Sequence, residues 1–165
     1  MKLLELFDKQ APYEWTNEFH GMPAATFEAG DTKYLVAFMP WENNFGPFSK
    51  SEIPEKFETV MGALIANYEE GDLVSGNYLL GVGNASLVFT TALHIFEEYI
   101  GRYKPEVFAV AALVAEKRPA IYARIMKRFA KEIAKTGYTL VDEETMQNTP
   151  FGAMHAFYLL RQDLT

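Results

Sequence analysis

The chain contains no cysteine and only three histidines among its 165 residues. The absence of cysteine excludes a disulfide framework, a thiolate metal site and a cysteine nucleophile. His20, His94 and His155 lie far apart and lack the spacing of metal ligands, so we expect no metal site. No apolar run reaches transmembrane length and the first residues lack a secretory cleavage site, so we expect a cytoplasmic protein that does not enter a membrane.

Positive charge is scarce overall but concentrated in one segment. The 15 Lys and Arg against 22 Asp and Glu give a formal net charge of −7, which argues against general nucleic-acid binding. Apolar residues recur at helical spacing over 119–136, which predicts a helix that ends at Gly137. This segment is either a solvated helix face or a surface for an anionic partner. Its seven basic residues are Lys117, Arg118, Arg124, Lys127, Arg128, Lys131 and Lys135.

Apolar residues are abundant, and they predict a single domain spanning residues 1–165. Hydrophobic residues make up 49% of the chain and aromatics 15%, which excludes intrinsic disorder. Residues 24–29 and 32–39 alternate in polarity on either side of a Gly-Asp turn and predict a β-hairpin. Two more strands are predicted at 138–142 and 153–161, joined by a polar loop.

Two segments between these strands leave alternatives open. Residues 41–54 have the composition of an irregular loop, and the aromatic residues of its part 41–48 form either a partner-binding patch or a cover for the sheet. Residues 57–68 have apolar side chains at helical spacing, but they can equally form a buried strand with Gly62 as a bulge.

The centre of the chain, from Tyr78 to Leu113, predicts a β-α-β unit. A short strand leads into the turn G-V-G-N-A-S, and an amphipathic helix follows from Ser86 to Ile100. Gly101 stands where a helix C-cap is expected. The last strand, Val107 to Leu113, has no polar side chain, as is typical of a parallel strand buried on both faces.

The glycine turn is a candidate anion site. Small residues between a strand and a helix let backbone N–H groups approach an anion at the positive end of the helix dipole. No G-K-[ST] follows, so it is not a P-loop, and Leu87 stands at the third glycine of a dinucleotide fingerprint. The alternative is a tight turn that needs small residues for steric reasons.

The order of these elements resembles the GNAT (Gcn5-related N-acetyltransferase) fold. The segments that carry the resemblance are G-V-G-N-A-S-L-V-F, K-P-E-V-F-A-V-A-A, and R-P-A-I-Y-A-R-I-M-K-R-F-A followed by G-Y. They are similar above all to small phage-encoded GNAT-like proteins, over about residues 75–161. The resemblance implies an α/β (α+β) fold with a mixed, mostly antiparallel sheet around the β-α-β unit. It favours the strand alternative for 57–68.

The resemblance also implies a cofactor site. In GNAT enzymes the turn amides bind the pyrophosphate of acetyl-CoA, and a tyrosine on the last helix is the general acid toward the CoA thiolate. Tyr122 matches that tyrosine, although it can equally be a core aromatic, and Arg118 opens the helix beside it as a candidate for the CoA phosphates. The residues that match the turn are Gly81, Gly83, Asn84, Ala85 and Ser86.

One departure from the family pattern decides between two functions. The position three residues before the first glycine, which is Gln or Arg in the family, is Leu80 or Tyr78 here, depending on which glycine is aligned. This favours a non-catalytic protein that binds a host or virion protein through the basic helix 117–135 or the aromatic loop 41–48. The alternative is an acetyl-CoA-dependent N-acetyltransferase that acts on an amine of a protein or small molecule.

Overall fold

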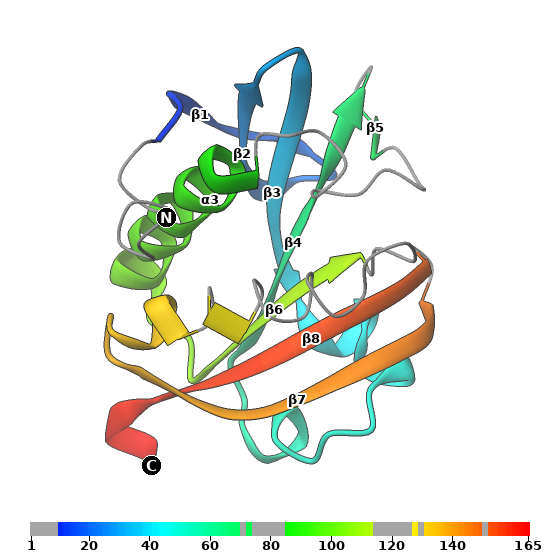
Figure 1. The fold of residues 1–165 in the computed structure, drawn as a ribbon. Coiled ribbons are helices and arrows are strands. Elements are labelled where there is room, and N and C mark those ends of the chain that lie inside the picture. The colour runs from blue at the N-terminus through cyan, green and yellow to red at the C-terminus, as the bar shows by residue number, and fades with distance from the viewer. Residues whose placement is uncertain (1–9, 70–71, 74–84, 114–126, 129–130, 150–151) are drawn as a thin grey trace.

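Figure 1 shows the chain as a computed structural model that describes residues 10–69, 72–73, 85–113, 127–128, 131–149 and 152–165. The strands are β1 (Tyr13–Phe19), β2 (Met22–Ala29), β3 (Thr32–Pro40), β4 (Val60–Glu69), β5 (Asp72–Leu73), β6 (Val107–Leu113), β7 (Tyr138–Thr149) and β8 (Gly152–Arg161). The helices are α2 (Trp41–Asn44) and α3 (Ala85–Tyr103), with 3-10 turns η1 (Gly46–Phe48), η2 (Pro54–Lys56) and η4 (Gln162–Leu164).

Seven strands lie side by side in the order β1-β2-β3-β4-β6-β8-β7, and the two-residue strand β5 pairs with β4. Every neighbouring pair is antiparallel except β4 and β6, which are parallel and have α3 between them in the chain. The predicted mixed, mostly antiparallel sheet is therefore confirmed. A β-α-β unit is present, but its first strand is β4, and the strand predicted at Tyr78 lies outside the described residues.

The predicted hairpin is formed by β2 and β3. Alternate side chains of β3 point to opposite faces of the sheet and belong to two separate hydrophobic cores. Val36 and Phe38 belong to the helix-side core, which is packed between the sheet and α3. Leu35 and Ala37 belong to the loop-side core on the opposite face, which residues 41–59 cover. All four side chains are fully buried. Because both faces of the sheet are covered, the side chains on both faces of β3 are apolar, as is typical of a central strand.

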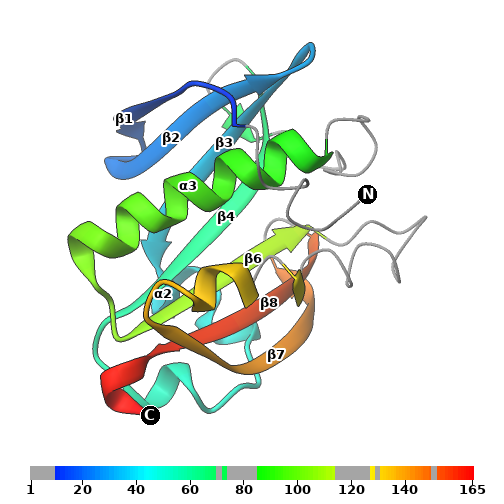
Figure 2. The same ribbon diagram turned by 60° about the vertical axis from the view of Figure 1, so that its left-hand side comes forward.

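Helix α3 forms as predicted and covers one face of the sheet (Figures 1 and 2). Its apolar stripe packs aromatic rings against the strands. The ring of Tyr99 stacks on that of Phe38 with centroids 3.9 Å apart, and Phe96 meets Phe108 edge-on at 5.3 Å. Such pairs add to the stabilisation that comes from burying their area.

The end of α3 differs from the prediction at Gly101. The helix continues to Tyr103, and Lys104 takes the left-handed conformation with φ of 47°. The N–H of Lys104 donates to the carbonyl of Ile100 at 2.9 Å. Because Pro105 cannot continue the helix, the chain leaves it immediately before the proline, and the glycine stays inside.

Residues 57–68, for which the sequence left a helix and a strand open, contain most of strand β4. The pairing of β4 is unbroken at Gly62, which lies opposite Met39 on β3 and Ala109 on β6. The strand alternative is therefore confirmed, and the bulge at Gly62 is wrong. The helical spacing misled because β4 is buried from both faces, so its apolar residues do not alternate.

Strand β7 is much longer than the predicted segment 138–142. Its polar part continues to Thr149, paired with β8, and the predicted loop shrinks to a tight connection. Met146 is buried in the loop-side core opposite Met154. The strand was missed because one of its faces supports polar groups of residues 41–59 and therefore carries acidic side chains.

A β-bulge at Val141 reverses the faces of β7. Leu140 pairs with Leu159, and Asp142 pairs with Tyr158. Val141 is therefore an extra residue on β7 that has no partner on β8 in the register. Even-numbered residues face the helix-side core before the bulge and the loop-side core after it. The extra residue is left exposed, and a bulge of this kind commonly redirects side chains near functional sites.

Of the predicted helix 119–136, residues 127–128 and 131–134 are described and helical. Residues 114–126 and 129–130 lie outside the described part. Gly137, predicted to end this helix, has φ of 104°, a conformation that glycine adopts without strain.

Candidate functional site

Residues 41–59, the covering segment, connect β3 to β4 across the face of the sheet opposite α3 (Figures 1 and 2). Pro40 ends β3, and one helical turn follows in which the N–H of Phe45 donates to the carbonyl of Trp41 at 2.9 Å. Pro47 stands in the first turn of η1, where its missing N–H needs no partner. Pro54 has the same place in η2.

Trp41 anchors the covering segment to the sheet. The centroid of its ring lies 4.8 Å from that of Phe45 and 5.4 Å from that of Tyr158, which it meets edge-on. A Cβ atom built on Gly62 would lie 2.9 Å from Cε3 of Trp41, closer than packed atoms approach. Gly62 is therefore a glycine because the indole lies directly on the backbone of β4.

The Glu144 carboxylate on β7 holds the middle of the covering segment. Its Oε2 accepts hydrogen bonds from Ser49 Oγ at 2.8 Å, from the Ser51 N–H at 3.0 Å and from the Tyr158 hydroxyl at 2.5 Å. Its Oε1 accepts the N–H of Lys50 at 2.7 Å. The carboxylate thus accepts from four donors, two of which are backbone N–H groups of a segment that has no strand partner there.

Burial and these donors act in opposite directions on Glu144. Burial alone would raise the pKa of the carboxyl, but the hydrogen bonds from Tyr158, Lys50, Ser49 and Ser51 outweigh it and hold the pKa below its ordinary value. Burial and the neighbouring carboxylate raise the pKa of the Tyr158 hydroxyl. A carboxylate with a lowered pKa is a weak base, and a phenol with a raised pKa is a weak acid. This group is therefore suited to holding the segment and not to proton transfer.

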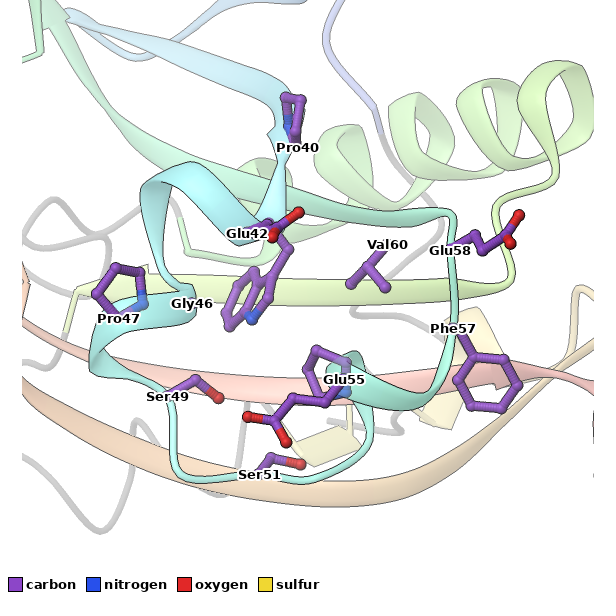
Figure 3. A pocket seen from close by; sticks show the side chains of 12 residues that line it. Pro40, Glu42, Gly46, Pro47, Ser49, Ser51, Glu55, Phe57, Glu58 and Val60 are labelled. Atoms are coloured by element: carbon purple, nitrogen blue, oxygen red, sulfur yellow. The ribbon is translucent and has the colours of Figure 1, made fainter.

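A cavity of about 500 Å³ lies between the covering segment and the start of β4. Figure 3 shows the side chains that surround it. Its apolar walls come from Pro40, Trp41, Pro47, Pro54, Phe57 and Val60. Gly46, Ser49 and Ser51 also line it, together with Glu42, Glu55 and Glu58.

The charge of the cavity lining is of one sign. Glu42, Glu55 and Glu58 are exposed, and none of them forms an ion pair with any residue that the structure describes. No Lys, Arg or His is among the described residues that line the cavity. In Figure 3 the Glu55 carboxylate lies toward Ser49 and Ser51, whereas the Glu58 side chain points outward.

The indole nitrogen of Trp41 is a buried donor without a partner. The residue is 1% exposed, and its Nε1–H donates to no acceptor in the described part of the chain. A buried polar group in this state is destabilising by about 1–3 kcal/mol unless something satisfies it. The same residue forms a wall of the cavity.

Most of the predicted cofactor residues lie outside the described part of the chain, so their arrangement stays a prediction. Tyr122 and Arg118 lie outside the described residues, as do Gly81, Gly83 and Asn84. Ala85 and Ser86 form the first turn of α3, and only their backbone is described.

The cavity and the start of α3 are distant from each other. Val60, which lines the cavity, pairs with Val107 at the start of β6, shortly after α3 ends. The 19 residues of α3 therefore separate the cavity end of the sheet from the glycine turn. At 1.5 Å per residue this helix is roughly 28 Å long. The cavity also lies on the other face of the sheet, so it is not the predicted cofactor site.

The basic segment 117–135 is described only in part. Lys127, Arg128, Lys131 and Lys135 are exposed. Lys127 lies 4.0 Å from Glu143, and Lys135 forms an ion pair with Glu132 at 2.9 Å. Exposed pairs of this kind contribute little to stability.

The aromatic loop 41–48 is a cover for the sheet. Trp41 is 1% exposed and Phe45 is fully buried, while Phe48 packs partly buried against the loop-side core. This is the second of the two alternatives that the sequence left open. As the segment lies here, its aromatic side chains cannot form an exposed partner-binding patch.

The described residues contain no group of three or more His, Asp or Glu placed to hold a metal ion. Among them, no helix has both the length and the apolar character needed to cross a membrane.

Sequence reasoning missed the cavity. The signal that could have indicated it is the spacing of Pro40, Pro47 and Pro54, which brackets aromatic residues in a rigid, irregular segment. The two partners that complete the site, Gly62 and Glu144, lie on other strands, and nothing in the local pattern connects them.

Comparison of the chain with known protein families, with functionally characterised proteins and with solved structures finds no match. The resemblance to GNAT proteins and to their phage-encoded members therefore stays a prediction, and function is inferred from the geometry.

Proposed function

We propose that this protein acts by binding a partner in the cavity of the covering segment, on a GNAT-like scaffold, and not by transferring an acetyl group. The observation that carries the proposal is the cavity. At about 500 Å³ it has the size of a ligand site, and it combines apolar walls with a few polar groups.

The groups near the cavity that could do chemistry have structural roles instead. The Ser49 and Tyr158 hydroxyls are held by Glu144, and the Ser51 hydroxyl donates to Asp142 at 2.7 Å. Of the residues that the structure describes, no histidine lines the cavity to activate a hydroxyl. These contacts support binding over catalysis at this site.

A fragment screen by two-dimensional NMR tests the proposal. Neutral, cationic and anionic fragments are added to the labelled protein, and we expect binders to shift the backbone amides of Gly46, Phe57 and Val60. The amides of Ala85 and Ser86, at the far end of α3, serve as internal controls. If no fragment shifts the cavity amides, the proposal is wrong.

Filling the cavity provides a matched pair of variants. Val60→Phe adds volume to a residue that lines the cavity, so the cavity shifts should disappear. Val141→Phe adds the same volume at the exposed bulge of β7 and should leave them unchanged. Equal shifts in both variants would place the binding elsewhere.

Acetyl transfer is the second candidate, and one observation favours it. The parallel pair β4 and β6 is bridged by α3 and followed by the antiparallel pair β7 and β8, which is the order that the GNAT resemblance implies. Calorimetry with millimolar acetyl-CoA tests it, because a ligand that binds the folded state must stabilise it. We expect no stabilisation. Stabilisation together with turnover that Tyr122→Phe reduces would establish the enzyme instead.

A further inference from the structure

We infer that the occupant of the cavity is an arginine-bearing segment of a protein partner. The inference rests on the proposed function and narrows it to one class of ligand. It follows from the charge of the rim, the shape of the walls and the unsatisfied donor at Trp41.

The charge of the rim favours a cation. Glu42, Glu55 and Glu58 have no ion pair among the described residues, and no described basic side chain lines the cavity. A bound anion would lie beside three carboxylates that no described basic side chain offsets, whereas a cation would gain charge-assisted hydrogen bonds. Figure 3 places Glu42 and Glu55 around the cavity and directs Glu58 outward, so the first two carboxylates should dominate.

The walls favour arginine over lysine. Phe57, Val60 and the prolines offer apolar surface to a long hydrocarbon stem. The planar guanidinium stacks on aromatic rings and binds carboxylates with two parallel hydrogen bonds, which an ammonium group cannot do. The cavity exceeds what one side chain fills, so flanking residues of the segment enter it as well.

The donor at Trp41 favours a peptide over a small amine. Its Nε1–H has no acceptor in the described part of the chain, and the residue lines the cavity. Each residue of a peptide brings a backbone carbonyl next to the side chain, whereas a simple amine or guanidine brings no acceptor. A peptide segment thus offers a cation to the carboxylates of the rim and a carbonyl acceptor to the Trp41 N–H.

Blocked tripeptides test the inference by calorimetry or NMR titration. The probes are acetyl-Gly-Arg-Gly-amide, the lysine equivalent and the citrulline equivalent, which keeps the shape of arginine without its charge. We expect the arginine peptide to bind tightest and the citrulline peptide at least about tenfold more weakly, since a charge-assisted hydrogen bond contributes more than a neutral one. Equal affinity of the arginine and citrulline peptides would overturn the inference.

The variants Glu42→Gln and Glu55→Gln, combined, should weaken binding of the arginine peptide about tenfold and reduce its salt dependence. Glu52→Gln, an exposed carboxylate of the same segment that does not line the cavity, is the matched control and should bind like the unaltered protein. Unchanged binding in the double variant would contradict the inference.

Other outcomes separate this inference from the proposed function. If neutral fragments occupy the cavity while charged peptides do not, the site stands and the arginine preference is wrong. If the unaltered protein self-associates in sedimentation and Glu42→Gln with Glu55→Gln abolishes that, the occupant is a second copy that contributes residues such as Arg128, and the inference of a separate partner is overturned. If nothing shifts the cavity amides, both fail.

Discussion

One face of the sheet packs against α3, whose aromatic rings contact those of the strands. The other face is covered by residues 41–59, which contain only short helical turns and donate hydrogen bonds to the carboxylates of Glu144, Asp142 and Glu106. The helix satisfies its own backbone groups, so apolar packing suffices to hold it. The covering segment cannot, so it donates hydrogen bonds to Glu144, and a cavity remains beside them. The difference explains why the candidate site lies on the loop side.

The largest effect should come from two matched phenylalanines. Phe38 and Phe45 are both fully buried, the first in the helix-side core and the second in the covering segment. Phe38→Ala should lower the free energy of unfolding by about 3–5 kcal/mol, as measured by denaturant titration. Phe45→Ala should lower it less, because the covering segment can open without global unfolding. Equal losses would break the distinction between the two faces.

The next effect concerns how closely Trp41 lies on β4. Gly62→Ala places a Cβ 2.9 Å from the indole, so we expect a loss of about 1–3 kcal/mol and an altered near-UV spectrum. Gly101→Ala is the control, since nothing lies within 4 Å and alanine is the better helix former there. That variant should gain about 0.5–1 kcal/mol. A neutral Gly62→Ala variant would mean that the indole does not hold the segment.

An effect of similar size should come from the carboxylate that holds the covering segment. Glu144→Gln removes the charge that four donors share and should cost about 1–3 kcal/mol at neutral pH, with faster amide exchange at Lys50 and Ser51. Glu143→Gln alters an exposed neighbour, paired with His155 at 3.2 Å, and should change stability by less than about 1 kcal/mol.

The Glu144 variant also has a signature in pH. Because the folded pKa of Glu144 lies below its ordinary 4.5, its contribution is present above that value and is lost as the pH falls through the folded pKa. Glu144→Gln should therefore flatten the decline of stability in acid, and the difference between the two proteins should shrink as the pH falls. A difference that stays constant with pH would exclude the charge as the cause.

Local pattern predicted the hairpin of β2 and β3, helix α3 and the apolar strand β6, because each has a period or an uninterrupted apolar run of its own. It could not predict β7 beyond residue 142. The bulge at Val141 reverses the faces of that strand, so acidic residues become the inward ones on the loop side. No periodic template anticipates such a reversal.

The candidate site was beyond prediction for a different reason. The burial of Trp41 depends on the missing side chain at Gly62, and the path of residues 49–51 depends on Glu144, more than 90 positions away in the chain. The sequence shows an aromatic, proline-containing loop, whereas only the sheet order reveals which strands it meets.

The two tryptophans offer the most direct measurement. Trp41 lines the cavity, and Trp15 lies on β1, in a smaller hollow beside Tyr103 at the end of α3. Their indole N–H signals can be followed separately during titration with acetyl-Gly-Arg-Gly-amide and with acetyl-CoA. We predict that the arginine peptide shifts the Trp41 signal and not that of Trp15, and that acetyl-CoA shifts neither. A Trp41 signal that stays in place while the peptide binds elsewhere would contradict the account.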